Sequence, residues 1–432
     1  MASARFAPSG PLRGSLRPPS DKSISHRAAL IAAMGNGETV IEDYLDAADT
    51  RSTLEAVSAL GAQVNEITEL GKEPLFRIRG VGLQGVSSST IDVGNAGTLL
   101  RLLPGWLAGQ ERGVWTLDGD DSIRKRPVDR IATPLRQMGA ALSCREERLP
   151  PLRIEGTPLR GISYEMPVAS AQVKSCLLFA GLLADGSTTV LEGLPSRDHT
   201  ERMLISAGAT IKRDAGAITV QPVDGLDPGE FAIPADISSA AFFIVAALLV
   251  GGSDVVLEQV GTNPTRTGLL TILGRMGAEI EIEPQAERGG EPTGRLRIRP
   301  ASLQGVDVGG AEIPLAIDEL PLVALAACYA EGTTTIRNAE ELRRKESDRI
   351  ATVSAALSAL GGKIEPTKDG MVVEGTGGLS GGTIDSHGDH RIAMMGAVAG
   401  LASKNGVEVH GMDAADVSYP GFQRDLVSLL DI

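Results

Sequence analysis

The chain has 432 residues, of which 42% are hydrophobic and 22% are charged, a balance typical of a folded globular protein that excludes a mainly disordered chain. Acidic residues outnumber basic ones by 55 to 41, and the resulting net charge of −14 argues against a large nucleic-acid-binding surface. An anion-binding site in such a protein has to be made locally, by clustering cations.

The cysteines and the apolar segments predict a cytoplasmic protein with no membrane partner. Cys144, Cys176 and Cys328 are odd in number and widely spaced, which predicts neither a disulfide framework nor a paired-cysteine metal site. The first 15 residues lack the apolar core of a secretory signal. The longest apolar run, near 240–250, is far shorter than the roughly 20 residues that span a bilayer.

One pattern recurs six times along the chain: a small polar cluster, an apolar stretch rich in Ala and Leu, and then Gly before a β-branched run. Each apolar stretch is hydrophobic nearly all round, which predicts a helix buried on every side. The six copies lie at 23–41, 94–117, 170–191, 236–257, 318–336 and 389–409.

A second, amphipathic helix follows in each copy and is expected to end before a glycine with positive φ. These glycines are Gly61, Gly139, Gly208, Gly277 and Gly361, while 419–430 is a truncated sixth copy. Alternating strands such as 278–282 and 296–298 come next. Each copy therefore predicts a β-α-β-α-β-β unit.

Six such units predict an α/β fold of two similar globular domains with three repeats each. The boundary is expected near 222–234, which is rich in Pro, Gly and Asp. The alternative is one continuous α/β domain in which the internal similarity is incidental.

Polar clusters stand where the buried helices are expected to begin. Ser23 and Asp236 are suited to be simple N-caps, and Asp318 opens the fifth buried helix, where it is either a cap or a functional acid. Capping does not explain Lys22 and Arg27, nor a third cation, Arg101, because cations at a helix N-terminus oppose the helix dipole. A bound anion would explain them.

Three basic loops precede second helices, at 124–127, 196–199 and 343–349. A basic run is commonly a solvated face, but recurrence at one place in the repeat predicts a cleft that binds phosphate and carboxylate groups. Glu346 lies within the third loop. Neighbouring cations favour its ionised form and burial favours its acid form, and the sequence leaves both open.

Two other kinds of site are disfavoured. The cluster His387–Arg391 lacks a third conventional ligand at a matching spacing, so no metal is predicted. The chain also lacks the GxxxxGK[ST] motif of phosphate-loop kinases.

Seven segments carry a resemblance to a known family: PPSDKSISHR (18–27), GNAGTLLR (94–101), RKRPVDRI (124–131), SAQVKS (170–175), SRDHTERM (196–203), LRRKESDRI (342–350) and GDHRIAM (388–394). In these motifs the chain resembles the 5-enolpyruvylshikimate-3-phosphate synthase family of enolpyruvyl transferases. The resemblance implies an N-terminal domain of 21–232, a C-terminal domain of 1–20 plus 233–432, and an active site in the cleft between them.

The resemblance also implies a reaction. The 5-hydroxyl of shikimate 3-phosphate attacks C2 of phosphoenolpyruvate, C3 is protonated, and phosphate leaves the tetrahedral adduct. No metal or organic cofactor is expected, the partners are these two small molecules, and a monomer is expected.

Matching the motifs residue by residue gives the implied roles. Asp318 would take the proton of the 5-hydroxyl, and Glu346 and Lys22 would donate protons to C3 and to the leaving phosphate. Shikimate 3-phosphate would be bound by Lys22, Ser23, Arg27, Ser170, Ala171, Gln172, Ser196, Asp318 and Lys345. Phosphoenolpyruvate would be bound by Lys22, Gly97, Arg126, Gln172, Arg349 and Arg391.

Some positions depart from the better-known pattern. Ala171 replaces a second Ser, so a contact there must come from the backbone, and 196–201 stands where other members carry a Tyr. These features resemble a subgroup in which glyphosate tolerance is common. Because Gly97 leaves the space that an Ala would fill, glyphosate is nevertheless expected to compete with phosphoenolpyruvate.

Two alternatives remain. The sister family that acts on UDP-N-acetylglucosamine usually carries Lys-Asn near the N-terminus and often a Cys in a mobile loop, whereas this chain has Lys22-Ser23 and no Cys at 120–126. A two-domain anion-binding protein without enzymatic activity is the other alternative.

Overall fold

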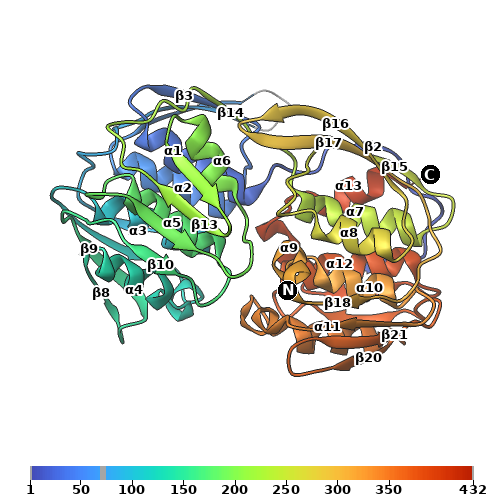
Figure 1. Ribbon diagram of the computed structural model, residues 1–432. Helices are drawn as coiled ribbons and strands as arrows, with labels where there is room; N and C mark the ends of the chain where they lie inside the picture. The colour runs from blue at the N-terminus through green and yellow to red at the C-terminus, as the bar shows by residue number, and fades with distance from the viewer. Residues whose placement is uncertain (1, 69–73, 431–432) are drawn as a thin grey trace. The chain divides into compact units, whose positions relative to one another are not determined.

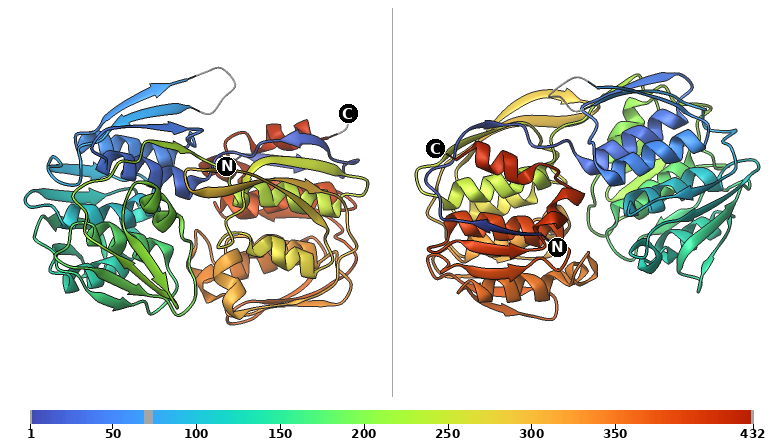
Figure 2. Two further views of the ribbon diagram at one scale, coloured as in Figure 1. Left: turned by 45° about the horizontal axis from the view of Figure 1, so that its top comes forward. Right: turned by 180° about the vertical axis from the view of Figure 1, so that it is seen from behind.

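The computed structural model describes residues 2–68 and 74–430, which pack as two compact units. The N-terminal unit consists of 20–234 together with 287–291. The C-terminal unit consists of the chain up to Pro19, 235–286 and the residues from Pro292 onwards. Figures 1 and 2 show the elements of each unit. Each unit has its own hydrophobic core.

The N-terminal unit contains three copies of one sheet. In each copy an outer strand pairs in parallel with a second strand, which pairs antiparallel with one arm of a hairpin. The strand orders are β14-β3-β5-β4, β6-β7-β9-β8 and β10-β11-β13-β12. The strands are β3 (Glu38–Glu42), β4 (Gln63–Ile67), β5 (Leu75–Arg79), β6 (Ser89–Asp92), β7 (Val114–Asp118), β8 (Ala141–Arg145), β9 (Leu149–Glu155), β10 (Ser163–Glu165), β11 (Thr188–Leu191), β12 (Ile211–Asp214), β13 (Ala217–Val220) and β14 (Glu230–Ala232).

The C-terminal unit repeats this sheet twice and ends in a shorter one. Its strand orders are β16-β17-β15-β2, β18-β19-β21-β20 and β1-β23-β22. Strands β1 and β2 come from the start of the chain, so this segment is part of the C-terminal unit. The strands are β1 (Ser3–Phe6), β2 (Arg13–Leu16), β15 (Asp254–Gly261), β16 (Ile280–Arg288), β17 (Glu291–Ile298), β18 (Asp307–Val308), β19 (Thr333–Ile336), β20 (Lys363–Pro366), β21 (Met371–Glu374), β22 (Gly382–Asp385) and β23 (Val407–His410).

Six helices fill the two cores, as their all-round apolar sequences predicted. In the N-terminal unit α3 packs on both α1 and α5, and in the C-terminal unit α7, α10 and α12 pack pairwise. In α7 every residue but the last is buried, because Ala, Ile, Phe and Val cover all its faces. These helices are α1 (Lys22–Met34), α3 (Gly97–Ala108), α5 (Ala171–Gly181), α7 (Ile237–Leu249), α10 (Leu320–Ala327) and α12 (His390–Ala402).

The second helices cover the cores with one face. The five predicted glycines follow them with φ between 94° and 111°, a left-handed conformation that costs glycine nothing. These helices are α2 (Ala48–Ala59), α4 (Asp129–Gln137), α6 (His199–Ser206), α8 (Gly268–Arg275), α11 (Arg349–Ala359) and α13 (Phe422–Ser428), and short helices lie at η1 (Ile123–Lys125), η2 (Gly310–Glu312), α9 (Ile313–Ala316), η3 (Glu340–Arg344) and η4 (Met412–Val417).

Three predicted helix starts are wrong. Asp318 does not open a helix: it lies between α9 and α10, because Pro321 takes the first turn of α10 and Glu319 the cap position. Ser23 lies inside α1, whose cap is Asp21. The last helix begins at Phe422 rather than near 419, because Gly421 adopts φ 86° before it.

Within the described ranges, no helix has both the length and the hydropathy that crossing a bilayer requires.

Candidate active site

Lys22, the first residue of α1, is held by a carboxylate from α2. Its Nζ lies 3.0 Å from Oδ2 of Asp49, whose side chain is 9% exposed. Burial acts to raise the pKa of Asp49, but the charge of Lys22 and its hydrogen bond to the carboxylate outweigh this and hold that pKa below its ordinary value. Asp49 is therefore an anion that orients Lys22. The sequence motifs gave Asp49 no role.

Arg27 is a buried cation one turn further along α1. It donates through Nε to Thr200 Oγ1 at 2.7 Å, through Nη1 to the Ser23 carbonyl at 2.8 Å and through Nη2 to Ser175 Oγ at 3.0 Å. These three acceptors are uncharged. Burial lowers the pKa of Arg27 to about 10, so the guanidinium stays charged at neutral pH. Its charge is thus available to a bound anion.

The start of α3 is fitted closely to Arg126. A methyl carbon built at Gly97 would lie 2.6 Å from Nη1 of Arg126. Nη2 of the same guanidinium donates to Asn95 Oδ1 at 3.0 Å. Glycine at 97 therefore gives Arg126 access to the free N–H groups at the start of α3, where an anion is favoured.

The start of α5 holds the remaining polar residues predicted for this unit. Ser170 caps the helix by accepting a hydrogen bond from Val173 N, and Ala171 is its first residue. The side chain of Gln172 is fixed by Arg101, which donates from Nη1 to Gln172 Oε1 at 2.7 Å. Arg101 is thus a second residue whose role the motifs did not supply.

Ser196 is held by a buried cluster of charged side chains. Its hydroxyl donates to Oε1 of Glu192, whose Oε2 lies 3.0 Å from Lys174 Nζ. Lys174 is 1% exposed and its Nζ also lies 2.7 Å from Oε1 of Glu201. The Ser196 hydroxyl therefore points at Glu192 in this structure, and its predicted contact with shikimate 3-phosphate would need the hydroxyl to turn.

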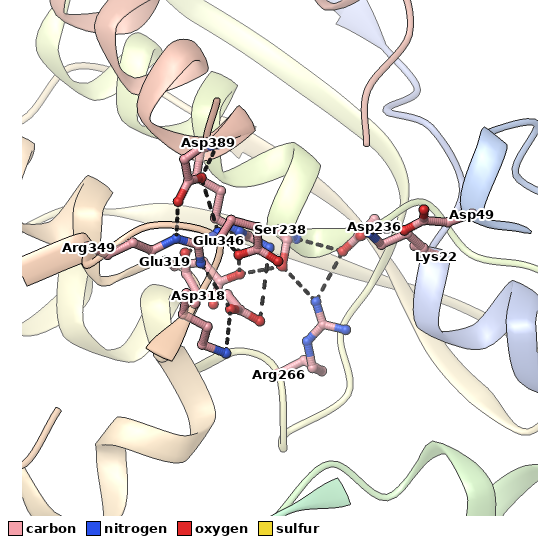
Figure 3. A network of polar contacts seen from close by, with 12 residues as sticks. Lys22, Asp49, Asp236, Ser238, Arg266, Asp318, Glu319, Glu346, Arg349 and Asp389 are labelled. Atoms are coloured by element: carbon pink, nitrogen blue, oxygen red, sulfur yellow. Dashed lines mark hydrogen bonds and ion pairs between the residues drawn. The ribbon is translucent and has the colours of Figure 1, made fainter. Parts of the chain in front are cut away.

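In the C-terminal unit, Asp318 lies among three cations. Figure 3 shows it beside one of them, Arg349. Oδ1 of Asp318 is 3.2 Å from Lys345 Nζ and 3.4 Å from Arg349 Nη1, and its Oδ2 is 4.0 Å from Arg391 Nη2. These cations come from the loop before α11, from α11 and from α12. Asp318, which sequence could have explained as a helix cap, is instead the residue on which they converge.

Arg349 is 1% exposed and is held by two carboxylates (Figure 3). Nη2 lies 2.7 Å from Glu346 Oε2, and Nε lies 2.8 Å from Oδ2 of Asp389, the cap of α12. Asp389 belongs to the segment 387–391, in which two His and one Asp lie close together in the sequence. The structure gives the Asp and the first His separate surroundings. The Asp389 carboxylate anchors Arg349, while the His387 side chain is 57% exposed and 3.9 Å from Asp385.

The protonation state of Glu346, which the sequence left open, follows from its neighbours. Burial acts to raise the pKa of Glu346, but the positive charges of Arg349, His390 and Lys345 outweigh it and hold that pKa well below its ordinary value. Glu346 is therefore a carboxylate in this structure. Of the residues that the structure describes, no three His, Cys, Asp or Glu side chains group in a way that could hold a metal ion.

The paired three-repeat units, with cations and carboxylates gathered at the starts of the buried helices, define a protein of the enolpyruvyl transferase fold. The solved structure of EPSP synthase from Acinetobacter baumannii superposes with a TM-score of 0.89 at 40% identity, covering 99% of this chain and 98% of that one.

Comparison of sequences gives the family. The model of EPSP synthase (3-phosphoshikimate 1-carboxyvinyltransferase) matches residues 6–426. A 3-phosphoshikimate 1-carboxyvinyltransferase of Geobacter sulfurreducens is 47% identical over 98% of each chain. One from Synechococcus sp. (strain JA-3-3Ab) is 48% identical over 99% of this chain and 96% of its own. The chain belongs to the EPSP synthase family.

Proposed function

We propose that this protein transfers the enolpyruvyl group of phosphoenolpyruvate to the 5-hydroxyl of shikimate 3-phosphate and releases phosphate, a step of aromatic amino acid biosynthesis. The observation that carries the proposal is the position of Asp318, a carboxylate surrounded by Lys345, Arg349 and Arg391. Such a group is placed to take a proton from a hydroxyl while the cations bind anionic substrates.

In the first step the 5-hydroxyl oxygen bonds to C2 of phosphoenolpyruvate, its proton passes to Asp318, and C3 takes a proton from the protonated form of Glu346. In the second step the bond from C2 to the phosphate oxygen breaks and C3 loses a proton, which regenerates the double bond. Lys22, an ammonium held by Asp49, is suited to protonate the departing phosphate. The proton taken by Asp318 returns through solvent to Lys22, so atoms and charge balance without another reactant.

Glu346 is a carboxylate in this structure, and once it has donated a proton to C3 it is again a carboxylate, suited to accept the proton that C3 loses. To donate one, it must be protonated beforehand. Phosphoenolpyruvate is anionic, and its binding to Arg349 would offset the charge that now stabilises the Glu346 carboxylate at 2.7 Å. Its pKa would then rise towards the range of a proton donor.

The binding roles divide between the units. In the N-terminal unit Lys22, Ser23, Arg27, Ser170, Ala171, Gln172 and Ser196 would bind shikimate 3-phosphate. In the C-terminal unit Asp318 and Lys345 would bind the same molecule. Phosphoenolpyruvate would be bound by Lys22, Gly97, Arg126, Gln172, Arg349 and Arg391, and glyphosate would compete for these contacts.

We further propose a cytoplasmic monomer. All three cysteines are free, and Cys176 and Cys328 are buried, as suits a reducing compartment. A molar mass by light scattering that corresponds to two chains would overturn the monomer.

The test is release of inorganic phosphate from phosphoenolpyruvate with either acceptor. Turnover with shikimate 3-phosphate and none with UDP-N-acetylglucosamine is the expected result. Asp318→Asn, which keeps the shape and removes the base, should reduce this turnover by at least about a hundredfold. Phosphate release only with the sugar nucleotide, or with neither acceptor, would overturn the proposal.

A further inference from the structure

Glu319 is a buried carboxylate without an assigned role. It occupies the cap position of α10 and is 1% exposed, yet its side chain makes no hydrogen bond to the start of that helix. Glutamate is not among the residues favoured for capping, and burial of a carboxylate is costly unless it is paired. Neither helix formation nor exposure to solvent accounts for its presence.

The side chain of Glu319 reaches two other helices. Its Oε1 accepts a hydrogen bond from Ser238 Oγ on α7 and lies 3.5 Å from Nη1 of Arg391 on α12. Its Oε2 accepts no hydrogen bond from the residues that the structure describes. Glu319 therefore links the starts of the three buried helices of the C-terminal unit.

Within the described part of the chain, the hydrogen bonds of the Arg391 guanidinium to other side chains and carbonyls are made by Nη1. Nη1 donates to the carbonyl of Asp318 at 3.0 Å and faces Glu319, while Nη2 is 4.0 Å from Oδ2 of Asp318. The side chain of Arg391 is 13% exposed, so it is not sealed in the core. An arginine held at one nitrogen by a carboxylate and a carbonyl keeps its other N–H groups in a fixed direction.

Ser238, which donates to Glu319, is itself held by Arg266 and Asp236 (Figure 3). Ser238 Oγ accepts from Nη2 of Arg266 at 2.7 Å, and the same Nη2 lies 3.1 Å from Oδ1 of Asp236, the cap of α7. Arg266 is 3% exposed. The rotamer of Ser238, and with it the carboxylate of Glu319, is thus fixed by an ion pair whose arginine is buried.

We infer that Glu319 is a positioning residue, which acts through Arg391 to orient its guanidinium for phosphoenolpyruvate. The inference rests on the proposed function. A carboxylate 3.5 Å from Nη1 stabilises one orientation of a flexible side chain before substrate arrives, so less conformational freedom is lost on binding. In this role Glu319 acts through its contacts with Ser238 and Arg391 and moves no proton.

The test is Glu319→Gln, which keeps the size of the side chain and an oxygen for the Ser238 hydroxyl but removes the charge beside Arg391. The KM for phosphoenolpyruvate should rise roughly tenfold, the loss of one charge-assisted contact. The KM for shikimate 3-phosphate should stay within twofold. The matched control is Glu312→Gln, which removes the partner of Arg275 elsewhere in the same unit and should change neither constant.

A double-mutant cycle separates positioning from a general structural role. In an Arg391→Lys background, Glu319→Gln should raise the KM for phosphoenolpyruvate by less than twofold, because the guanidinium that Glu319 orients is absent from that background. The same tenfold rise in both backgrounds would overturn the inference. If Glu319→Gln fails to fold, Ser238→Ala replaces it and should raise the same KM about threefold, and an unchanged KM would overturn the inference.

Failure of the inference and failure of the proposed function give different results. A wild-type protein that releases no phosphate removes the proposed function. A wild-type protein that turns over, with an unchanged KM in Glu319→Gln, removes only the role of Glu319.

Discussion

Nη2 of Arg349 lies 2.7 Å from Oε2 of Glu346, three residues earlier in the chain, while Nε of the same guanidinium lies 2.8 Å from Asp389. One buried arginine therefore joins a carboxylate proposed to move protons to a carboxylate that is fully buried. Asp389 fixes the position of Arg349, and Arg349 sets the charge state of Glu346. This link makes the acid–base behaviour of Glu346 depend on whatever else binds Arg349.

Glu346→Gln should therefore reduce kcat by about 10²–10⁴, the usual contribution of a positioned acid or base. Gln keeps the size of the side chain and an oxygen for Arg349, so the thermal unfolding temperature should hold. The measurement is phosphate release at saturating substrates. Glu340→Gln, which alters an exposed acid at the start of η3, is the control, and equal rates for the two variants would contradict the role of Glu346.

His26 gives the protein a pH-dependent stability. It is fully buried, its Nδ1 lies 2.6 Å from Thr53 Oγ1, and burial lowers its pKa to about 3. Below pH about 6.5 this histidine binds a proton in the unfolded chain but stays neutral in the folded protein. Acidification therefore stabilises the unfolded state, so the stability present above pH about 6.5 is progressively lost as the pH falls. Between pH 6.5 and 4.5 the free energy of unfolding should fall by up to about 1.4 kcal/mol per unit.

Urea unfolding at several pH values measures this slope. His26→Gln should flatten it in that window, because the titrating group is gone. His387→Gln, which alters an exposed side chain, should keep the wild-type slope, and a slope unaffected by His26→Gln would contradict the assignment.

Gly97→Ala should raise the KM for phosphoenolpyruvate roughly tenfold, the effect of weakening one charge-assisted contact. The added methyl would meet Arg126 Nη1 at 2.6 Å, and the guanidinium is the part that gives way because it ends a flexible side chain. The variant should fold normally and lose sensitivity to glyphosate in a competition assay. Gly37→Ala, where a methyl meets nothing within 4 Å, is the control.

Lys174→Met should destabilise the protein by about 3–5 kcal/mol, because it leaves Glu192 and Glu201 buried without their cation. The contrasting variant is Lys363→Met. Its ion pair with Glu374 is 63% exposed on the lysine side, so its loss should cost less than about 1 kcal/mol. Denaturant midpoints measure both, and equal losses would contradict the prediction.

Features set by a few consecutive residues could be predicted from the sequence. The six buried helices follow from apolar stretches with no polar face, and Asp236 caps α7 as predicted. The five glycines after the second helices have positive φ because only glycine adopts it without strain. The predicted start of the fifth buried helix at Asp318 was wrong because Glu319 takes the cap position of α10 and Pro321 lies in its first turn.

Partners distant in the chain could not be predicted in this way. Asp49 contacts Lys22 across 27 residues, Asp389 contacts Arg349 across 40, and Glu319 contacts Ser238 across 81. No local pattern marks such pairs, because the packing of separate repeats brings them together. The charge state of Glu346 was undecided for the same reason. It depends on the balance between burial and the distances to Arg349, Lys345 and His390, and only the tertiary structure sets those distances.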